Sequence, residues 1–577
     1  MTGSTSALAS RCLIPPTKFR ISMIAWVGVA ASMLATAPVM AGSHCVDLAA
    51  LHGANVTITV AEVVDSASTV SDSLAQTKVQ TPFCRVGGFI SPTGDSHIGF
   101  EVWLPVAGTW NSKLAAVGNG GLSGALNYRA MLSAFNRGYA TMTTDLGHIS
   151  TPPGSVEDAT WALGHPDKVV DYAYRAEHLS TQAARQVIAN YYGSGPAHSY
   201  YSGCSAGGIQ GMTELLRFPG DFDGYIIGDA TPDHLGQEMA AFWNTLAASL
   251  ASPPEALKAP EVMAVHKAIL QQCAGKDGGL ASDPFLSNPQ VCKFEPSKLQ
   301  CAAGQDGATC LTKAQVGILE RIYGGPASPG TRERILSGLT PGTELGWDKY
   351  FVGKSNPVGP ERPWAGFLAS MVYSDPDYLS QQKYLSFDFD KDYQRLRQQV
   401  VGGESLDSSW NTRNRDLEPF RKSGGKVIHY HGWDDPNIPA LEAVKFYQDV
   451  VADQAARRRM TSREAQVATR EFYRLFMVPG MGHCSGGEGP SSFGQNGQRP
   501  LKPDPEYDTL SALEDWVEQG AAPEQFIGSR VDVKTGAIDM TRPICAYPKS
   551  PAWKGSGSAF DASNFTCIGG SAPSKRK

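Results

Sequence analysis

Three absences narrow the class of this 577-residue chain. No two cysteines have the C-x-x-C spacing and no histidine cluster accompanies them, which argues against a structural zinc site. No internal repeat is present, so a repeat architecture is excluded. Positive charge is not in excess, because 50 basic side chains face 56 acidic ones and the formal charge is −6 at pH 7. This balance argues against nucleic acid or an anionic membrane as a partner.

The N-terminal apolar run is short for a membrane anchor. Residues 21–34 are apolar, fewer than the ~20 that a transmembrane helix needs. They follow three basic residues and no acidic one, and they precede a small-residue cleavage site at Val39-Met40-Ala41. We predict that residues 1–41 are a secretory signal peptide, whose removal would change the formal charge to −9. The mature protein is then expected to be periplasmic or secreted, without membrane contact.

The cysteine count supports export independently. Cys12 lies in the predicted signal peptide, and an even number of ten cysteines remains. An even count in an exported chain indicates disulfides, whose connectivity the sequence alone does not fix. The remaining cysteines are Cys45, Cys84, Cys204, Cys273, Cys292, Cys301, Cys310, Cys484, Cys545 and Cys567.

The hydrophobic pattern predicts an α/β fold. Strand-like runs at residues 97–104, 113–117 and 139–144 alternate with a helical run at 168–190. This alternation is typical of a parallel sheet covered by helices. With 42% hydrophobic residues, 61 glycines and 38 prolines, the chain is a loop-rich globular protein that exceeds one compact core.

The middle of the chain interrupts this pattern. Residues 232–417 are rich in proline, glycine and aromatics and hold four cysteines, with helical stretches at 260–272 and 312–323. The segment is too long for a connection between core elements. We predict an inserted lid domain at 232–417 between two parts of one core, at 42–231 and 418–577.

Residues 203–207, Gly-Cys-Ser-Ala-Gly, have the pattern of a nucleophile elbow. A serine presented for attack needs a sharp turn between a strand and a helix, and the flanking glycines allow the close backbone approach of such a turn. The aromatic residues before the motif suit a strand end, and residues 209–217 suit a helix. Ser205 is therefore a candidate nucleophile. Because G-x-S-x-G also occurs by chance in glycine-rich chains, the rest of a triad has to support it.

Two later loops offer an acid and a base in the chain order typical of this motif. Residues 426–439 contain a short apolar strand and a Gly-Trp-Asp-Asp-Pro turn, in which we choose Asp435 over Asp434 as the acid. Residues 472–479 form another strand, and the glycine-rich loop after it ends in His483, the predicted base. His483 would take the proton of the serine, and the acid would orient the imidazole.

Cysteines flank two members of this predicted triad. Cys204 directly precedes Ser205, and Cys484 directly follows His483. A disulfide between them would keep serine and histidine within hydrogen-bond reach, roughly 2.6–3.2 Å. The joint pattern disfavours purely structural roles for Ser205 and His483. A disulfide-bonded Cys204 would not be a nucleophile.

The chain resembles the tannase and feruloyl esterase family, which is marked by Cys-Ser, Asp and His-Cys in this order. The resemblance runs from about Cys45 to Cys567 and includes further segments in family order. These are Trp110-Asn111, Gly118-Asn119-Gly120-Gly121, Thr144-Asp145-Leu146-Gly147-His148, Arg217-Phe218-Pro219 with Asp223-Gly224, and Val478-Pro479-Gly480-Met481-Gly482-His483-Cys484. It implies an α/β-hydrolase core with a large inserted lid domain. It also implies an extracytoplasmic serine esterase of the feruloyl esterase or tannase type, which cleaves esters of aromatic acids through an acyl-enzyme.

The resemblance implies further details of the site. The oxyanion would be bound by the backbone N–H of Ala206 and, by resemblance, that of Gly121. The chemistry requires no cofactor, and the partner is a small-molecule aromatic ester. The implied disulfides are Cys45–Cys84, Cys204–Cys484, Cys273–Cys292, Cys301–Cys310 and Cys545–Cys567.

Calcium is a separate question, because family members commonly bind it through aspartates after the first lid cysteine. Here Cys273 is followed by alanine, and a later Asp-Gly pair of the family pattern is missing. Asp277 and Asp283 remain as candidate ligands. Calcium needs about 6–8 oxygen ligands, so backbone carbonyl groups would have to supply others. The alternative is a solvated polar loop.

The choice of substrate rests on the lid. Members of the family act on feruloyl or other hydroxycinnamoyl esters, on galloyl esters, or on mono(2-hydroxyethyl) terephthalate. Trp364 and Phe367 could stack on a ring and Arg362 could pair with a carboxylate, as in the terephthalate enzyme, but packing of the lid explains them equally well. Ile438, three residues after the predicted acid, is more typical of feruloyl esterases and tannases. We therefore predict a phenolic-acid ester, with a terephthalate monoester as the alternative.

Two other classes remain open. A non-catalytic aromatic-binding protein on the same fold is disfavoured by the complete set of triad residues. A peptidase could use the same triad, but the flanking cysteines favour an esterase. Cleavage of p-nitrophenyl esters without hydrolysis of casein would separate these classes, and the sequence leaves the oligomeric state open.

Overall fold

The computed structural model describes residues 44–53, 55–71, 76–249, 256–305, 310–352, 366–412, 414–532 and 534–569. The predicted signal peptide lies outside them. All elements described below belong to one unit, Ala41–Lys577. Across these described ranges, no helix combines the length and the apolar character that a membrane span requires.

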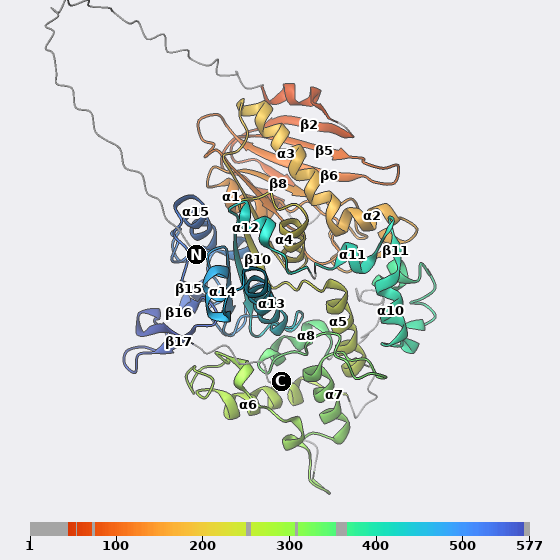
Figure 1. The fold of residues 1–577 in the computed structure, drawn as a ribbon, viewed down its shortest axis with the longest axis vertical. Coiled ribbons are helices and arrows are strands. Elements are labelled where there is room, and N and C mark those ends of the chain that lie inside the picture. The colour runs from red at the N-terminus through yellow and green to blue at the C-terminus, as the bar shows by residue number, and fades with distance from the viewer. Residues whose placement is uncertain are drawn as a thin grey trace, which may run out of the picture. The chain divides into compact units, whose positions relative to one another are not determined.

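A ten-stranded mixed sheet forms the centre of this unit (Figure 1). Its last six strands are mutually parallel, and the first four extend it as an antiparallel meander. In spatial order the strands are β1 (His52–Gly53), β2 (Val56–Val64), β5 (Phe83–Ile90), β6 (Ile98–Pro105), β8 (Ala140–Thr144), β7 (Lys113–Val117), β9 (His198–Cys204), β10 (Gly224–Gly228), β13 (Lys426–Gly432) and β14 (Tyr473–Val478). Parallel strands have their carboxyl ends at one edge of the sheet, so the loops after β9, β10, β13 and β14 lie together there.

Helices cover both faces of the parallel strands. Adjacent residues of β10 pack into different cores: Tyr225 and Ile227 join the cluster that includes side chains of α3, α4 and α13, whereas Ile226 joins that of α1 and α15. Side chains of a strand alternate between faces, so a strand buried on both sides is apolar throughout. The helices around the sheet are α1 (Tyr128–Phe135), α2 (Pro166–Val170), α3 (Ala176–Tyr192), α4 (Ala206–Arg217), α13 (Leu441–Arg458), α14 (Ser462–Thr469) and α15 (Thr509–Gln519).

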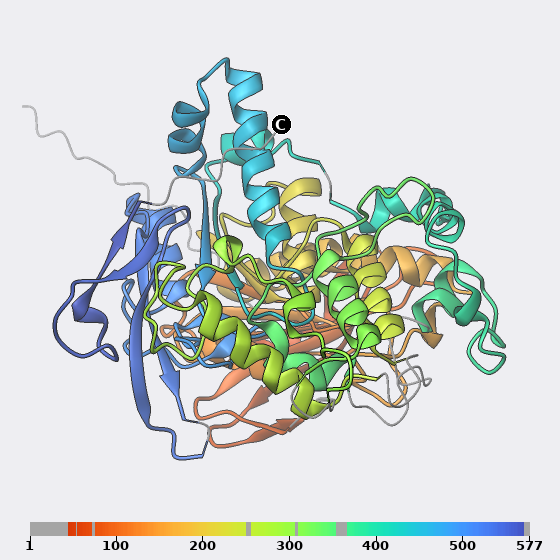
Figure 2. The ribbon, with the colours of Figure 1, turned by 90° about the horizontal axis from the view of Figure 1, so that it is seen from below.

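The chain leaves the sheet after β10 and returns to it at β13. The intervening helices and short strands are α5 (His234–Ser249), α6 (Ala259–Cys273), α7 (Lys313–Gly324), α8 (Trp347–Tyr350), α10 (Lys391–Gln398), β11 (Val400–Val401), β12 (Glu404–Ser405), α11 (Leu406–Trp410) and α12 (Glu418–Lys422). The first part of this insertion has its own hydrophobic core between Ala247 and Val352, and its green helices lie side by side in Figures 1 and 2. Its last part, from Phe367 to Leu417, packs into the core of the sheet. The boundaries of a lid domain stay a prediction.

Short two-stranded sheets and five disulfides complete the structure. The sheets pair β3 (Thr69–Ser71) with β4 (Gln76–Lys78), β15 (Gln525–Val531) with β16 (Ile538–Cys545), and β17 (Ser550–Trp553) with β18 (Phe565–Ile568). The disulfides have the connectivity that the family resemblance implies: Cys45–Cys84, Cys204–Cys484, Cys273–Cys292, Cys301–Cys310 and Cys545–Cys567.

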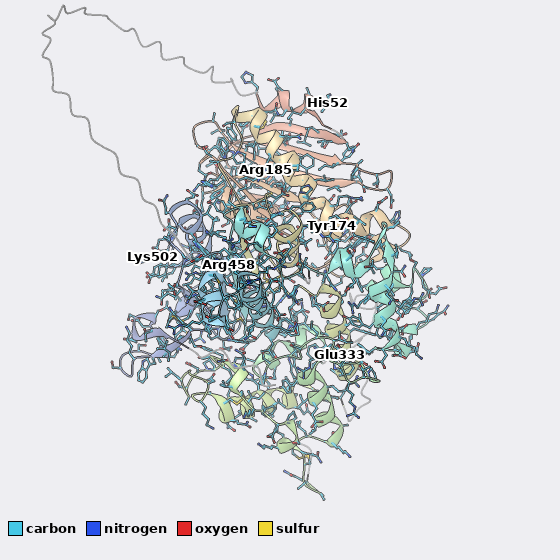
Figure 3. All side chains as sticks on the ribbon, viewed as in Figure 1. His52, Tyr174, Arg185, Glu333, Arg458 and Lys502 are labelled. Atoms are coloured by element: carbon cyan, nitrogen blue, oxygen red, sulfur yellow. A yellow bond between two sulfur atoms is a disulfide. The ribbon has the colours of Figure 1, made fainter. Side chains whose placement is uncertain are left out.

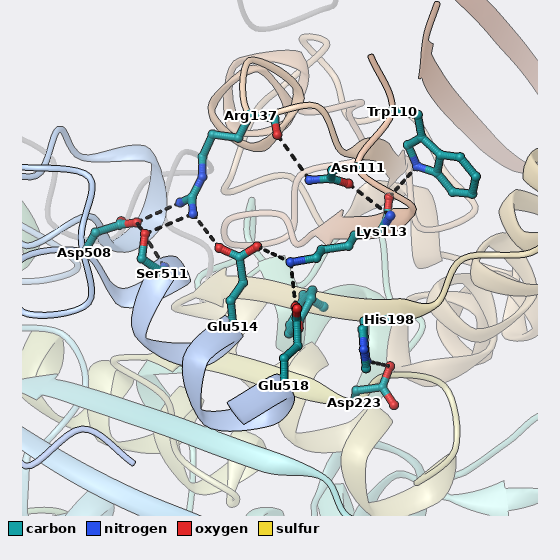
Figure 4. Close-up of polar contacts among 11 residues, drawn as sticks. Trp110, Asn111, Lys113, Arg137, His198, Asp223, Asp508, Ser511, Glu514 and Glu518 are labelled. Carbon is teal, nitrogen blue, oxygen red and sulfur yellow. Dashed lines mark hydrogen bonds and ion pairs between the residues drawn. The ribbon is translucent and has the colours of Figure 1, made fainter. Parts of the chain in front are cut away.

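An ionic cluster fixes α15 against the sheet (Figure 4). Glu514 accepts from Arg137 Nη2 at 2.6 Å and from Lys113 Nζ at 2.7 Å. Lys113 also pairs with Glu518 at 2.6 Å, and Arg137 with Asp508, the N-cap residue of α15, at 2.7 Å. These bonds join a C-terminal helix to the start of β7 and the loop after α1.

Most predicted elements are confirmed. The strands expected at residues 113–117 and 472–479 correspond to β7 and β14, and the helices expected at 260–272 and 312–323 correspond to α6 and α7. The helical run expected at 168–190 is continuous but contains a π-helical turn at Asp171–Arg175. Tyr172, on that turn, reaches the candidate site.

Candidate active site

Ser205 occupies the turn between β9 and α4. Its backbone has φ 62° and ψ −127°, in a region that L-residues rarely adopt. Its N–H donates to the carbonyl oxygen of Gly228 at 3.0 Å, which holds the turn against the end of β10. Backbone strain of this kind is typical of functional positions.

The glycines around this serine are required by close backbone approaches. A Cβ on Gly203 would lie 2.4 Å from the carbonyl oxygen of Gly207, and a Cβ on Gly208 would lie 2.3 Å from that of Gly228. A Cβ on Gly207 would lie 2.8 Å from the carbonyl oxygen of Asn119. No side chain fits at these three positions, so the sequence motif follows from packing as well as from chemistry.

The structure brings the three predicted triad residues together. His483 Nε2 lies 2.8 Å from Ser205 Oγ, and its Nδ1 lies 2.8 Å from Asp435 Oδ2. The other oxygen of Asp435 accepts the backbone N–H groups of Asn437 at 2.8 Å and Ile438 at 3.0 Å. The carboxylate is therefore fixed on both sides, and it is completely buried.

Asp434, the alternative acid, has a different environment. Its backbone N–H donates to Met481 at 3.0 Å, and its Oδ1 lies beside Gly342 of the insertion, without a hydrogen-bond partner among the described residues. Burial raises the pKa of Asp434 well above its ordinary value, with smaller contributions from other acids. Asp434, whose pKa is raised, is therefore a poorer anion behind the imidazole than Asp435, whose pKa is lowered.

Electrostatics match the roles of base and acid. Burial by itself would lower the pKa of His483, but the nearby charges of Asp435 and Asp229 outweigh it and raise the pKa above its usual 6.5. Burial would likewise raise the pKa of Asp435, but His483 and His431 hold it well below its ordinary value. The acid is ionised at neutral pH, and the imidazole is a stronger base than a free histidine.

A cavity of about 390 Å³ opens in front of the serine. Ser205, His483 and the loop of residues 118–121 line one part of it. The two predicted oxyanion donors, Ala206 and Gly121, both lie in this lining.

Several side chains fix the loop that contains Gly121. Tyr172, from the π-helical turn, donates its hydroxyl to Gly121 O at 2.8 Å. His148 Nε2 lies 2.9 Å from Leu122 O, and its ring stacks on Trp161 at 3.8 Å. Burial lowers the pKa of His148 to about 4, so its neutral ring donates to the carbonyl at neutral pH.

The insertion supplies another wall of the cavity, which the sequence analysis missed. His234, Gln237 and Glu238 of α5 line it, together with Lys349 and Tyr350 of α8. His234 Nε2 lies 3.3 Å from Glu238 Oε1. The buried Gln237 Oε1 and Glu238 Oε2 have no hydrogen-bond partner within the described part of the chain. Three polar residues at i, i+3 and i+4 in the first turns of α5 were the available signal, but the sequence does not show which way the helix faces.

The predicted substrate residues lie elsewhere or outside the described residues. Arg362 and Trp364 fall in residues 353–365, which the structure does not describe. Phe367 is completely buried against Trp410, at 5.2 Å between ring centres. Ile438 is also completely buried, and neither it nor Phe367 is among the lining residues of the cavity.

The two candidate calcium ligands are engaged with other groups. Asp283 pairs with Arg542, whose Nη2 lies 2.8 Å from Oδ1, and both side chains are 4% exposed. Asp277 accepts backbone N–H groups, among them that of Ser287 at 2.5 Å. Arg542 already supplies the positive charge that the buried Asp283 requires. These carboxylates therefore do not fit a calcium ion in this arrangement.

The fold and the position of the elbow define the class of protein. A large mixed sheet covered by helices, with a serine on the turn after a central parallel strand, is an α/β-hydrolase fold. The model of the tannase and feruloyl esterase family matches residues 84–568, so the chain belongs to this family. The protein is a carboxylic ester hydrolase.

Relatives and solved structures agree with this assignment. An uncharacterized esterase of Xanthomonas campestris pv. campestris is 37% identical over 541 residues, which are 92% of each chain. Feruloyl esterase B of Aspergillus niger is 30% identical over 508 residues, 88% of this chain and 90% of the relative. The crystal structure of feruloyl esterase B from Aspergillus oryzae is similar with a TM-score of 0.79 and 28% identity, over 91% of this chain and 99% of that chain. Tannin acyl hydrolase from Aspergillus niger shares the fold, with a TM-score of 0.69 and 20% identity over 89% and 92% of the two chains.

Proposed function

We propose that the protein is an exported serine esterase that hydrolyses esters of phenolic acids through an acyl-enzyme. The observation that carries this proposal is the continuous chain of hydrogen bonds from Ser205 Oγ through His483 to Asp435. This chain opens onto a cavity large enough for an aromatic ester. The names feruloyl esterase B and tannin acyl hydrolase of similar proteins support the same substrate class.

The chemistry follows from the arrangement of these atoms. Ser205 Oγ attacks the ester carbonyl carbon while His483 Nε2 takes the hydroxyl proton, and Asp435 stabilises the imidazolium that results. The tetrahedral oxyanion accepts from the N–H groups of Ala206 and Gly121. His483 then protonates the leaving alcohol, and the acyl group stays on the serine. A water then attacks the acyl carbon while His483 takes its proton. The bond from the acyl carbon to Oγ breaks, the acid is released, and His483 returns the proton to Ser205.

The α5 wall supports a substrate with ring hydroxyl groups. Gln237 Oε1 and Glu238 Oε2 are buried acceptors without a donor among the described residues. A buried acceptor left unpaired costs about 1–3 kcal/mol, and a phenolic O–H would supply the donor. Tyr172 and Leu122 add apolar surface for the ring.

A panel of esters tests this proposal. We expect hydrolysis of methyl ferulate or methyl gallate in preference to methyl cinnamate, which lacks ring hydroxyls, and no activity in the Ser205→Ala variant. Preference for mono(2-hydroxyethyl) terephthalate would mean that the substrates are terephthalate monoesters and not phenolic-acid esters. Phe367, which was predicted to stack on the ring of such a substrate, is completely buried and does not support this alternative. Cleavage of casein would indicate a peptidase, and a folded protein that binds but hydrolyses none of these esters would indicate a non-catalytic binding protein.

Export and metal independence belong to the same proposal. The five disulfides support an oxidising compartment, the periplasm or the medium. The chemistry above uses only groups of the chain, so we expect the activity to survive dialysis against EDTA. Loss of activity on dialysis that calcium restores would contradict this part of the proposal.

A further inference from the structure

A second buried carboxylate lies directly behind the predicted triad. Asp229 follows the last residue of β10 and is completely buried. Its backbone has φ 37°, a conformation that costs free energy in a non-glycine residue. Its N–H donates to Tyr430 O at 3.0 Å, so the residue joins the ends of β10 and β13.

The carboxylate of Asp229 connects the loops that supply the acid and the base. Oδ1 accepts the N–H of Gly432 at 2.7 Å, and Oδ2 accepts the N–H of Cys484. Gly432 lies three residues before the predicted acid, and Cys484 directly follows the predicted base. The carbonyl of Gly228, next to Asp229, accepts from the N–H of Ser205 at 3.0 Å. The loops that contain Asp435 and His483 therefore bind the carboxylate of Asp229, and the turn that contains Ser205 binds the neighbouring carbonyl group of Gly228.

His431 completes this arrangement. Its Nε2 lies 3.1 Å from Ile438 O, 3.5 Å from Asp435 Oδ2 and 3.8 Å from Asp229 Oδ1. All three neighbours are acceptors, so Nε2 carries the proton. The imidazole thus places a donor between the two buried carboxylates, which would otherwise repel each other.

We propose that Asp229 and His431 are positioning residues. They hold the loops of Asp435 and His483 at the distances from each other and from Ser205 that the reaction requires. This inference rests on the proposed serine mechanism. A misplacement of reacting groups by about 1 Å can cost roughly 100-fold in rate, so a bond that fixes both loops has a large effect without touching substrate. The backbone strain at Asp229 is explained, because this conformation lets one carboxylate reach both N–H groups.

The Asp229→Asn variant tests the inference. A carboxamide of the same shape has one acceptor oxygen, so its NH2 group would face one of the two backbone N–H donors. We expect kcat to fall roughly 100-fold with KM changed less than about threefold. Because Asp229 contributes to the raised pKa of His483, the acid limb of the pH–rate profile should also move to lower pH. Among the described residues, the other groups facing His483 are Asp435 and Ser205, the ring of Tyr350, and Asn437, and all remain in the variant.

A matched control lies at the opposite end of β10. Asp221 is also buried and accepts from His178 at 2.6 Å and Gln182 at 3.0 Å, far from the triad loops along the strand. Asp221→Asn should lower the melting temperature but leave kcat and the pH profile unchanged. Wild-type kcat and an unmoved acid limb in folded Asp229→Asn would overturn the inference.

A second variant keeps the test decisive if Asp229→Asn does not fold. His431→Phe replaces the imidazole with an apolar aromatic ring and so removes the Nε2 proton, and we expect about a tenfold lower kcat at unchanged KM. Wild-type kcat in this folded variant would overturn the inference. The proposed function fails separately, because it requires Ser205→Ala to be inactive whatever these variants do.

Discussion

His483 is the residue whose ionisation controls the proposed reaction. Its two ring nitrogens face Ser205 and Asp435, and buried carboxylates raise its pKa. The raised value makes the imidazole a better base, but it also keeps the ring protonated to a higher pH. Activity at neutral pH is a compromise between these effects.

The first prediction is the pH dependence of kcat/KM. Only the neutral imidazole accepts the serine proton, so activity is lost as the pH falls through the pKa of His483 in the folded protein. Because that pKa is raised, the acid limb should have its midpoint above 6.5. A pH–rate profile with a chromogenic ester measures it, and a midpoint clearly below 6.5 would contradict the electrostatic account.

A second prediction separates the two neighbouring aspartates. Asp435→Asn should lower kcat by roughly 10⁴, because the carboxamide neither stabilises the imidazolium nor selects the correct tautomer. Asp434→Asn should leave kcat near the wild-type value, since a neutral amide replaces a carboxyl group whose pKa burial raises well above its ordinary value. Steady-state kinetics of both variants decide the point, and similar losses in both would refute the assignment.

Single residues also mark the limit of what the sequence predicts. Ser205, Asp435 and His483 could be found because each follows a strand in a motif with flanking glycine or cysteine. Asp229 also follows an apolar strand, but no spacing shows that its oxygens reach two distant loops. Contacts across 255 residues of sequence arise only from the packing of the sheet.

Helix α15 illustrates stability at the scale of an element. Glu514 binds both Arg137 and Lys113, which lie 377 and 401 residues earlier in the chain. Its side chain is 18% exposed, so these ionic bonds are partly shielded from water.

The third prediction concerns this cluster. Glu514→Ala leaves two cations each with one partner fewer and should lower the free energy of unfolding by about 1–3 kcal/mol. Glu333→Ala, at an exposed loop of the insertion (Figure 3), should change it by less than about 0.5 kcal/mol. Denaturant unfolding of both variants gives the comparison, and equal effects would show that the cluster does not hold α15.

The sequence predicts some helices and strands better than others. Apolar runs such as those of β7 and β14 give a strong pattern because both faces of the strand are buried. The π-helical turn at Asp171–Arg175 and the direction of α5 have no such pattern. Tyr172 of the turn binds Gly121, and α5 packs on α7 of the insertion, so both depend on contacts between segments distant in sequence and the cavity wall was not predictable.

At the scale of the whole molecule, one disulfide has a special place. Cys204 and Cys484 are 280 residues apart and lie next to the serine and the histidine, whereas Cys301 and Cys310 are 9 residues apart in the insertion. Closing a long loop removes more conformational freedom from the unfolded chain. The first bond therefore contributes both to stability and to the alignment of the site.

The fourth prediction compares these two disulfides. Replacing Cys204 and Cys484 by alanine should lower the free energy of unfolding by about 5 kcal/mol and should also lower kcat. Replacing Cys301 and Cys310 should cost about 2.5 kcal/mol and leave kcat unchanged. Thermal unfolding and steady-state kinetics of both double variants test this, and an unchanged kcat in the first would mean that the bond is only structural.

The whole-molecule organisation could be predicted only in part. The sequence pattern and the resemblance predicted the α/β-hydrolase core, the insertion between β10 and β13 and the disulfide pairs. They did not predict that the last part of the insertion packs into the core of the sheet. That packing depends on contacts such as the one between Phe367 and Trp410, which are 43 residues apart in sequence.

The most direct test of the central claim is covalent labelling of the nucleophile. A small organophosphorus fluoride reacts with an activated serine, with loss of fluoride, and leaves a stable phosphoryl group on Oγ. We predict that esterase activity disappears as one label is incorporated per chain, and that mass spectrometry of the digested protein finds the label on Ser205. Full activity after labelling, or complete inactivation with the label on another residue, would contradict the account.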